Sequence, residues 1–404
     1  MGVITPRDGT VVVVAGTPDT DLWAVVGPRT FAAEQIRAAW DAGAAVTALD
    51  PSAPLTVQSD LLAQLRPTHL VDADGVRRFP GGTPVAAGTA AVVVTSGTTG
   101  VGKGVELTTT GARAVGEGWA AALGHDPADR WLVCLPLHHV AGLAILARAA
   151  VSGAAVTVHD GFDPAAVGAA VTGGGATLVS VVPTMLARLL DAGVPVHRYR
   201  AVVTGGAPVS PALRARAEAT GVRVVDAYGQ SETWGGCVAD GVAIPGASVR
   251  LGPADEVELL GAMVMRGYRL DPERTAAAFT PDGWLRTGDV GAFDDGRLRI
   301  VDRLRDLVIT GGVNVSPVEV EQVLAQHPGV TDVAVTGAPD AEWGERVVAH
   351  VVPADPAAPL TLDDLRAWAR DRLRSPQLPR ELVLVTEVPR SAGGKILRRV
   401  LRDG

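Results

Sequence analysis

The chain has 404 residues, of which 47% are hydrophobic and 20% are charged, and its formal net charge is -8. This length exceeds one ordinary domain, so two or three domains are expected, and the negative charge argues against nucleic acid as a partner. Cys134 and Cys237 are too few for a disulfide framework and lack metal-ligand spacing, so a reducing cytoplasm is the expected compartment.

The first half of the chain predicts strands and helices in alternation. No basic start with an apolar run marks a signal peptide, and the apolar segments are too short to span a bilayer. Strands are expected at 21–26, 44–50, 68–74, 90–96, 129–137, 155–160, 176–182, 199–206 and 222–229. Helices are expected at 31–43 and 56–67 and from residues 141, 164, 183 and 210 onward. This alternation favours an α/β fold with mostly parallel sheets.

The pattern changes beyond Val249, where short antiparallel strands with turns at Gly261 and 294–296 are expected. A new unit begins at Ser316, predicted as the N-cap of a helix with Glu319 reaching back as a capping box. Strands at 331–337 and 346–353 and a helix at 360–373 complete a small α+β domain. The predicted organisation is a large domain at 1–302 ending in a short β-rich part, a hinge at 303–306, and a small mobile domain at 307–404.

Polar, glycine-rich stretches follow four of the predicted strands. They are "TSGTTG", "LPLHH", "TGGAP" and "YGQSET". Ligands of open α/β sheets bind beyond the carboxyl ends of the strands. We therefore expect these four stretches to converge on one pocket.

The stretch "TSGTTGVGKG" at 95–104 nearly matches the P-loop of nucleotide hydrolases. Gly104, however, stands where a P-loop has the hydroxyl that binds Mg²⁺, and it supplies no oxygen. Glycines let backbone N–H groups approach an anion, hydroxyls add donors and lysine adds charge. The residues therefore predict a different loop, one that clamps the phosphates of ATP, formed by Thr95, Ser96, Gly97, Thr98, Thr99, Gly100 and Lys103.

This loop resembles the signature loop of the adenylate-forming superfamily, which includes acyl- and aryl-CoA ligases, luciferases and adenylation domains of peptide synthetases. Four more stretches match that family in the same order: "AYGQSET", "GWLRTGDVG", "VDRLRDLVITGGVNVSPVEVE" and "PRSAGGKILRR". Five matches in order span Thr95 to Arg399. The resemblance implies ATP, Mg²⁺ and coenzyme A as the small molecules bound.

The resemblance also implies roles for residues near the adenine and the phosphates. Tyr228 is expected to stack on adenine, and Glu232 is expected to be a catalytic residue and the Mg²⁺ ligand, a hard oxygen for a hard cation. Ser231 keeps a hydroxyl where many members have threonine. Further nucleotide contacts are expected from Gly206, Ala207, Asp226 and Gly229.

The later motifs imply the rest of the site. Asp289 and Arg303 are expected to bind the ribose hydroxyls, and Arg305 matches the hinge position about which the small domain turns. The catalytic Lys395 is expected to bridge the reacting carboxylate and the α-phosphate, where its charge would stabilise the transition state. Gly311 and Gly312 are expected to line the tunnel for coenzyme A.

Two departures from the family pattern stand out. Gly102 replaces the proline that usually precedes the loop lysine, and the region before the loop is shorter than in many members. The stretch "AAWDAGAAVTALDPSAP" still resembles the family's opening strand–helix unit.

The acid is indicated by what surrounds "LPLHHVAGL". Residues 131–158 contain no Asp or Glu to hold an α-ammonium group, which argues against an amino acid, and His139 resembles a pocket residue beside the acyl carbonyl in CoA ligases. "YGQSETWGGCVADG" resembles the short o-succinylbenzoate–CoA ligases of actinobacterial menaquinone biosynthesis. Two alternatives stay open, a CoA ligase for another acid and a non-catalytic adenylate-binding protein. The oligomeric state also stays open, with a homodimer among the possibilities.

Overall fold

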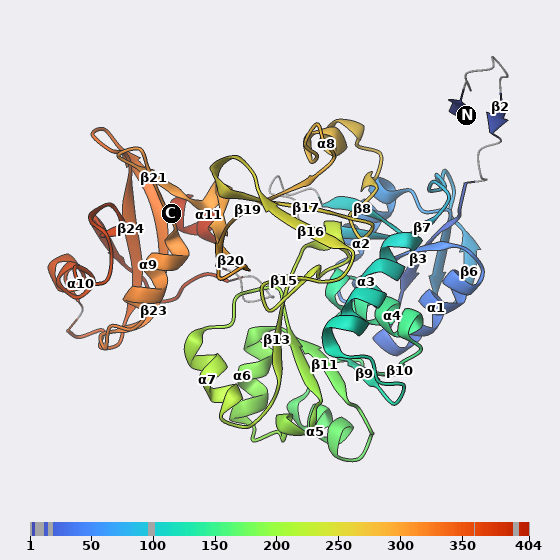
Figure 1. Cartoon of the computed structure of the whole chain (residues 1–404), viewed down its shortest axis with the longest axis horizontal. Coiled ribbons are helices and arrows are strands. Elements are labelled where there is room, and N and C mark those ends of the chain that lie inside the picture. Colours follow the sequence, from blue (N-terminus) through green and yellow to red (C-terminus); the bar gives the residue numbers. More distant parts are fainter. Residues whose placement is uncertain are drawn as a thin grey trace. The chain divides into compact units, whose positions relative to one another are not determined.

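The computed structural model describes residues 2–4, 12–14, 19–95, 102–358, 360–390 and 396–403. The chain divides into two compact units (Figure 1). The first unit comprises residues 1–248 and 260–283, and the second comprises residues 249–259 and 284–404. The predicted hinge at 303–306 lies inside the second unit, and that domain boundary stays a prediction.

One seven-stranded sheet of the first unit carries the phosphate-loop strands, in the order β18-β8-β7-β4-β3-β5-β6. Strands β3, β4, β5 and β7 pair in parallel, whereas β6, β8 and β18 join antiparallel at the two edges. The strands are β3 (Leu22–Val26), β4 (Ala45–Leu49), β5 (His69–Asp72), β6 (Gly75–Arg78), β7 (Thr89–Thr95), β8 (Lys103–Thr108) and β18 (Gly267–Tyr268). Its helices are α1 (Arg29–Asp41), α2 (Leu55–Leu65), α3 (Thr109–Leu123) and α8 (Pro272–Ala277).

A second seven-stranded sheet of the same unit has the order β10-β9-β11-β12-β13-β14-β15, parallel through β13 and antiparallel beyond it. Its strands are β9 (Arg130–Val133), β10 (Ala155–Val158), β11 (Leu178–Val181), β12 (Ala201–Thr204), β13 (Val224–Tyr228), β14 (Val238–Ala239) and β15 (Val242–Ala243). Its helices are α4 (Val140–Ser152), α5 (Pro164–Thr172), α6 (Pro183–Asp191), α7 (Pro211–Glu218) and the short η1 (Val196–Arg198) and η2 (Ser231–Thr233). A separate hairpin joins β1 (Gly2–Ile4) and β2 (Val12–Val14).

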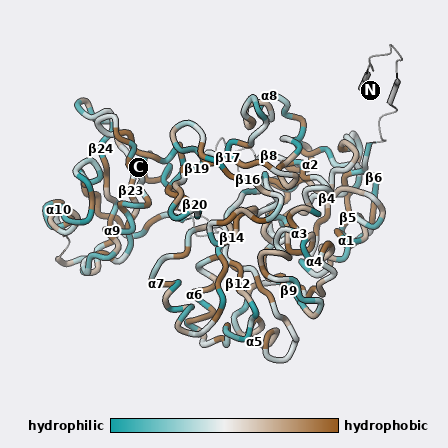
Figure 2. The backbone as a smooth tube through the Cα atoms, in the orientation of Figure 1, coloured by the Kyte–Doolittle hydropathy of each residue, from teal (hydrophilic) through white to brown (hydrophobic). Residues whose placement is uncertain are grey.

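The parallel strands are buried because helices cover both faces of such a sheet. Strands β4, β11 and β12 are buried along their whole length. Figure 2 shows the hydrophobic colour following strands such as β12, whereas the outer helix α10 (Leu362–Ala369) is mostly pale or hydrophilic. The strand ends are therefore held in a rigid frame from which the connecting loops project.

The second unit contains two antiparallel-rich sheets. A four-stranded sheet has the order β16-β17-β19-β20, and a five-stranded sheet has the order β22-β21-β24-β23 with β25 paired to β24. The strands are β16 (Ala247–Leu251), β17 (Glu256–Gly261), β19 (Leu285–Asp294), β20 (Arg297–Arg303), β21 (Val308–Thr310), β22 (Val313–Val315), β23 (Val330–Asp340), β24 (Gly344–Pro353) and β25 (Glu381–Leu384). Besides α10, the helices are α9 (Pro317–Leu324), α11 (Arg398–Asp403), η3 (Pro253–Asp255), η4 (Leu304–Asp306) and η5 (Ser375–Gln377).

The predicted fold class is confirmed, with parallel-rich α/β sheets, a β-rich part and a small α+β part (Figure 1). The sequence reading overlooked β8 and α3, which directly follow the phosphate loop.

Only one half of the capping box predicted at Ser316 forms, the side-chain cap made by Ser316. Ser316 Oγ accepts from Glu319 N at 3.2 Å, but the Glu319 carboxylate turns to Gln377 Nε2 at 3.1 Å. The buried Asp302 satisfies this helix start, accepting from Ser316 Oγ at 2.7 Å and from Val318 N at 3.0 Å.

Both cysteines are free and buried. Among the described residues, no helix combines the length and the apolar character needed to cross a bilayer.

Candidate active site

The phosphate loop connects two antiparallel strands, because Thr95 at the end of β7 pairs with Lys103 at the start of β8. A P-loop instead leads from a strand into a helix, so the P-loop interpretation is excluded. Gly104 lies inside β8, where an added Cβ would come within 2.7 Å of Leu65 and 3.0 Å of Val92. The predicted Ser96, Gly97, Thr98, Thr99 and Gly100 lie outside the described residues.

The replacement of the usual proline by Gly102 has a steric explanation. A Cβ at this position would lie 2.6 Å from Val94 Cγ1 and 3.2 Å from the carbonyl oxygen of Thr95. The carbonyl of Gly102 also accepts a hydrogen bond from the Gln64 side chain. The hairpin approaches its own first strand too closely for any side chain here.

Lys103 and Glu232 are brought together through a third residue, Tyr268. The Tyr268 hydroxyl donates to Glu232 Oε1 at 2.8 Å, and Lys103 Nζ lies 3.4 Å from that hydroxyl and 4.7 Å from the ring centroid. Glu232 is buried in η2, and its carbonyl accepts from Met265 N at 2.7 Å. Burial, and then the neighbouring Glu232 charge, raise the pKa of Tyr268, so its hydroxyl stays protonated.

These groups fit a magnesium-bound nucleotide. Thr95 Oγ1 is buried and has no hydrogen-bond partner among the described residues, so it is available to a ligand. The described residues hold no cluster of three or more His, Cys, Asp or Glu side chains able to bind a metal. Mg²⁺ is usually held by one or two carboxylates together with substrate phosphates, and a single buried Glu232 suits that arrangement.

The ends of β12 and β13 supply the backbone expected beside the adenine. Gly206 has φ +82°, a left-handed conformation that favours glycine, and Ala207 follows it. Tyr228 ends β13, and Ser231 begins η2. Gly229 packs so tightly that a Cβ would lie 2.7 Å from the carbonyl oxygen of Gly235.

Asp226, another predicted nucleotide contact, is engaged by the protein itself. Its carboxylate accepts from Thr204 Oγ1 at 2.7 Å and pairs with Arg214, and its backbone N–H donates to Asp240 at 2.8 Å. These contacts fix the carboxyl end of β13. Whether Asp226 also touches the nucleotide stays a prediction.

His139 caps the start of α4 and lies against His138, with ring centroids 4.4 Å apart at 61°. His138 Nε2 lies 4.0 Å from the Asp50 carboxylate, which follows β4. Burial, with a smaller contribution from His139, lowers the pKa of His138 to about 4, so this ring is neutral at pH 7. The predicted acyl-side histidine therefore belongs to a pair.

Arg148, which sequence reasoning did not single out, is a buried cation on the helix that starts beside His139. Its guanidinium carbon lies 4.3 Å from the centre of the Trp119 ring, and its Nε has no partner among the described residues. Burial lowers the pKa of Arg148 to about 9. A cavity of about 20 Å³, room for about one water molecule, is lined by both side chains. The Nε–H of Arg148 is therefore a buried donor that a water or a carboxylate oxygen could satisfy.

The same helix face leads from the histidine to Arg148. Gly235 lies near Val140 and Ala144, and a Cβ at Gly236 would be 3.3 Å from Arg148 Nη2. Residues four apart share a helix face. The stretch after Glu232 therefore runs along α4 from its start to Arg148.

In the second unit, Asp289 and Arg303 are directly opposite on β19 and β20, and Arg303 Nε lies 3.1 Å from Asp289 Oδ1. Asp289 is 4% exposed, so its carboxylate is held in place. The sequence predicted both residues as ribose ligands, and the sheet register places them side by side. Arg305 lies in η4 with its side chain half-exposed.

Gly311 and Gly312 form the two-residue turn between β21 and β22, with φ of +57° and +76°. A Cβ on Gly311 would lie 2.8 Å from the Trp343 ring, whereas a Cβ on Gly312 would meet nothing within 4 Å. The turn therefore requires glycine for its conformation, and Gly311 also for space.

Lys395 lies outside the described residues, but both flanks of its segment are anchored. Arg390 binds the Asp332 carboxylate at 2.8 and 3.0 Å and forms a bridge with Ile396. Arg398 binds the Glu321 carboxylate at 2.8 and 2.9 Å.

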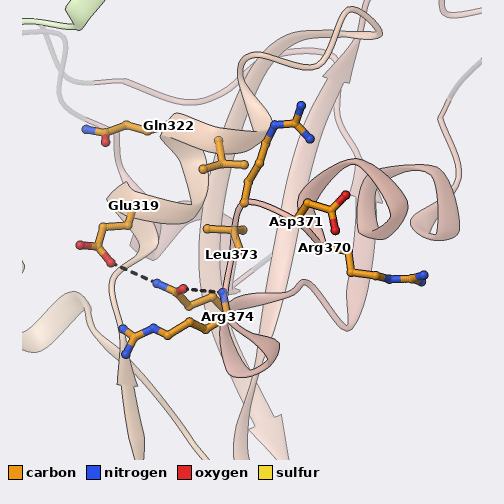
Figure 3. A pocket seen from close by; sticks show the side chains of 9 residues that line it. Glu319, Gln322, Arg370, Asp371, Leu373 and Arg374 are labelled. Atoms are coloured by element: carbon orange, nitrogen blue, oxygen red, sulfur yellow. Dashed lines mark hydrogen bonds between the residues drawn. The ribbon is translucent and has the colours of Figure 1, made fainter.

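A groove of about 560 Å³ in the second unit is lined by α9 and residues 370–377 (Figure 3). Arg370, Arg372 and Arg374 contribute three guanidinium groups, and Gln377 links Glu319 to the Arg374 backbone. Of the predicted site residues that the structure describes, none lines this groove.

Comparisons with known proteins agree with the motifs. Residues 81–265 match the AMP-binding enzyme family, and residues 319–395 match the AMP-binding enzyme C-terminal domain. A Mycobacterium tuberculosis protein called probable 2-succinylbenzoate–CoA ligase is 38% identical over 328 residues, covering 77% of this chain and 83% of that protein. A Rhodococcus jostii 3-[(3aS,4S,7aS)-7a-methyl-1,5-dioxo-octahydro-1H-inden-4-yl]propanoyl:CoA ligase is 37% identical, covering 77% of this chain and 64% of that protein.

A solved structure is also similar over nearly the whole chain. The o-succinylbenzoate CoA synthetase (MenE) of Bacillus subtilis, in complex with the acyl-adenylate intermediate OSB-AMP, has a TM-score of 0.83 and 27% identity, covering 96% of this chain and 89% of that one. The same synthetase in complex with ATP and a magnesium ion has a TM-score of 0.81 and 26% identity, covering 94% and 89%.

Proposed function

The chain belongs to the AMP-binding enzyme family, and we propose that it is an ATP-dependent acid–thiol ligase that converts o-succinylbenzoate and coenzyme A into o-succinylbenzoyl-CoA. ATP would be converted to AMP and pyrophosphate in the same reaction. Two free, buried thiols are compatible with the cytoplasm, where we expect this reaction to take place.

The choice of acid rests on Arg148. o-Succinylbenzoate carries a second carboxylate besides the one that reacts, and a buried guanidinium with an unsatisfied Nε is suited to bind it. Arg148 shares a helix face with the residues that follow His139, the predicted acyl-side residue. The 38% identical relative bears the name of a ligase for this acid, which supports the same choice.

In the first step, a carboxylate oxygen of the acid attacks the α-phosphorus of ATP and expels pyrophosphate, giving an acyl-adenylate. Thr95 and Lys103 would bind phosphate oxygens, and Asp289 with Arg303 would bind the ribose. Magnesium, when bound, would neutralise phosphate charge, and Glu232 would be its protein ligand. Lys395 would place its charge between the carboxylate and the α-phosphate.

In the second step, the thiol sulfur of coenzyme A attacks the acyl carbonyl, loses its proton and expels AMP. Dividing the synthesis into two displacements replaces one difficult step by two easier ones. The turn at Gly311 and Gly312 would line the path of the thiol, while the small domain at 307–404 turns about Arg305. His139 would stay beside the acyl carbonyl in both steps.

The test is acid-dependent pyrophosphate release over a panel of acids, followed by detection of the CoA thioester by mass spectrometry. The panel contains o-succinylbenzoate, two analogues that each lack one of its carboxylates, benzoate, and a bicyclic propanoate of the kind named for the Rhodococcus relative. We expect the highest kcat/KM with o-succinylbenzoate. A clear preference for the bicyclic acid would show that the ligase acts on a different acid, and no turnover with any acid would favour a non-catalytic role.

A further inference from the structure

Tyr268 holds an unusual position for a residue outside the recognised motifs. It lies on the edge strand β18, where it pairs with Val105 of β8, two residues after Lys103. Its backbone N–H donates to Thr275 Oγ1 at 2.8 Å, which fixes the strand to α8. The backbone of Tyr268 is therefore held from two sides, and its ring reaches the phosphate-loop lysine.

The Tyr268 hydroxyl lies between two groups of opposite charge and can act as a donor to one and an acceptor from the other. It donates to the Glu232 carboxylate at 2.8 Å, and the Lys103 ammonium group lies 3.4 Å from it on the other side. Within the described part of the chain, Lys103 and Glu232 form no direct ion pair. The phenol thus replaces the contact that these two charges would otherwise make with each other.

This separation has a functional consequence. A direct lysine–carboxylate pair in a partly buried site would neutralise both groups, and it would have to be broken before either could bind a ligand. A neutral phenol orients the carboxylate and leaves the formal charges in place. The aromatic face also attracts the ammonium group, which restrains the long lysine side chain.

We propose that Tyr268 is a positioning residue that orients the Glu232 carboxylate and the Lys103 ammonium group to receive magnesium-bound ATP. The proposal rests on the proposed function for the role of Glu232 and Lys103, and it does not depend on which acid is used. It predicts that the hydroxyl of Tyr268, rather than its ring, couples magnesium to nucleotide binding.

The test compares Tyr268→Phe with wild type in calorimetric binding of a non-hydrolysable ATP analogue, with and without Mg²⁺ and without any acid. The variant keeps the ring over Lys103 and removes the hydroxyl. Because a hydrogen bond to a charged group is lost, we expect the gain in affinity from magnesium to fall by about ten- to a hundredfold. Binding in EDTA should be unchanged.

The control is Tyr199→Phe, which removes another buried hydroxyl, one that donates to the carbonyl of Val167 at 2.8 Å. This variant should keep the full magnesium-dependent gain. Equal gains in Tyr268→Phe and wild type would overturn the proposal. So would an equal loss of analogue binding with and without Mg²⁺, because the hydroxyl would then serve nucleotide binding or folding in general.

A measurement that leaves Tyr268 intact covers the case in which Tyr268→Phe does not fold. In the Tyr199→Phe protein, adding Mg²⁺ to the analogue complex should perturb the tyrosine ultraviolet difference spectrum, and the perturbation should persist when Tyr228 is also replaced by Phe. An absent perturbation overturns the proposal. Failure of the acid panel would leave these binding measurements unaffected, so the proposed function and this proposal fail separately.

Discussion

Replacing Arg148 by Gln should reduce the use of o-succinylbenzoate strongly while leaving the protein at least as stable. The guanidinium is buried, and removing one partner of a buried ion pair typically costs about 3–5 kcal/mol. We therefore expect kcat/KM for o-succinylbenzoate to fall about a hundredfold to a few thousandfold. For the analogue that lacks the carboxylate bound by Arg148, kcat/KM should change little.

The stability expectation follows from the pKa. Burial lowers the pKa of Arg148 to about 9, so the fold disfavours its charged form. That penalty is present below pH 9 and fades as the pH rises through 9, where the folded protein releases the proton. At pH 7 the Gln variant should therefore melt no lower than the wild type, although it loses the contact with Trp119. In the wild type, kcat/KM for o-succinylbenzoate should fall above pH 9.

The assay measures pyrophosphate release with both acids from pH 7 to 10, together with the melting temperature. The matched control is Arg200→Gln, because Arg200 lines the same cavity but pairs with Asp129 and the carbonyl of Leu123. The control should lower stability and leave acid preference unchanged. Equal losses with both acids in Arg148→Gln, or a clear drop in its melting temperature, would refute the reasoning and make Arg148 a structural residue.

Three further predictions concern other parts of the site. Gly104→Ser should not increase acid-independent ATP hydrolysis, and it should lower the melting temperature because the new side chain would clash inside β8. A large rise in ATP hydrolysis would show that the loop functions as a P-loop after all. Lys395→Ala should slow adenylation about 10²–10³-fold yet transfer prepared acyl-adenylate to CoA at nearly the normal rate, and equal losses in single-turnover assays would contradict this. Gly311→Ala should impair the CoA step and lower the stability of the second unit more than Gly312→Ala does. Both variants lose about 1–2 kcal/mol to left-handed backbone strain, but only the alanine at 311 would clash with Trp343. Equal effects of the two variants would argue against the close contact between Gly311 and Trp343.

Part of the candidate site could be predicted from local patterns. The hydroxyls and glycines around 95–100 predict a phosphate-binding loop from their residue types, whereas the roles of Glu232, Asp289 and Arg303 are implied by the resemblance to the adenylate-forming superfamily. The strands were also predictable, because buried parallel strands such as β7 and β12 are continuous apolar runs. The near match to the P-loop pattern was misleading, since a short pattern does not reveal whether a strand or a helix follows.

Tertiary structure alone decided which distant residues meet. Tyr268 is 165 residues from Lys103 and 36 from Glu232, and only the pairing of β18 with β8 places its hydroxyl between them. Arg148 looks like an ordinary interruption of an apolar helix until packing buries it against Trp119, 29 residues earlier in the chain. Sequence determines what each side chain can do through its own chemistry and the local backbone it favours, whereas burial, pKa and partners arise from long-range contacts that no local pattern contains.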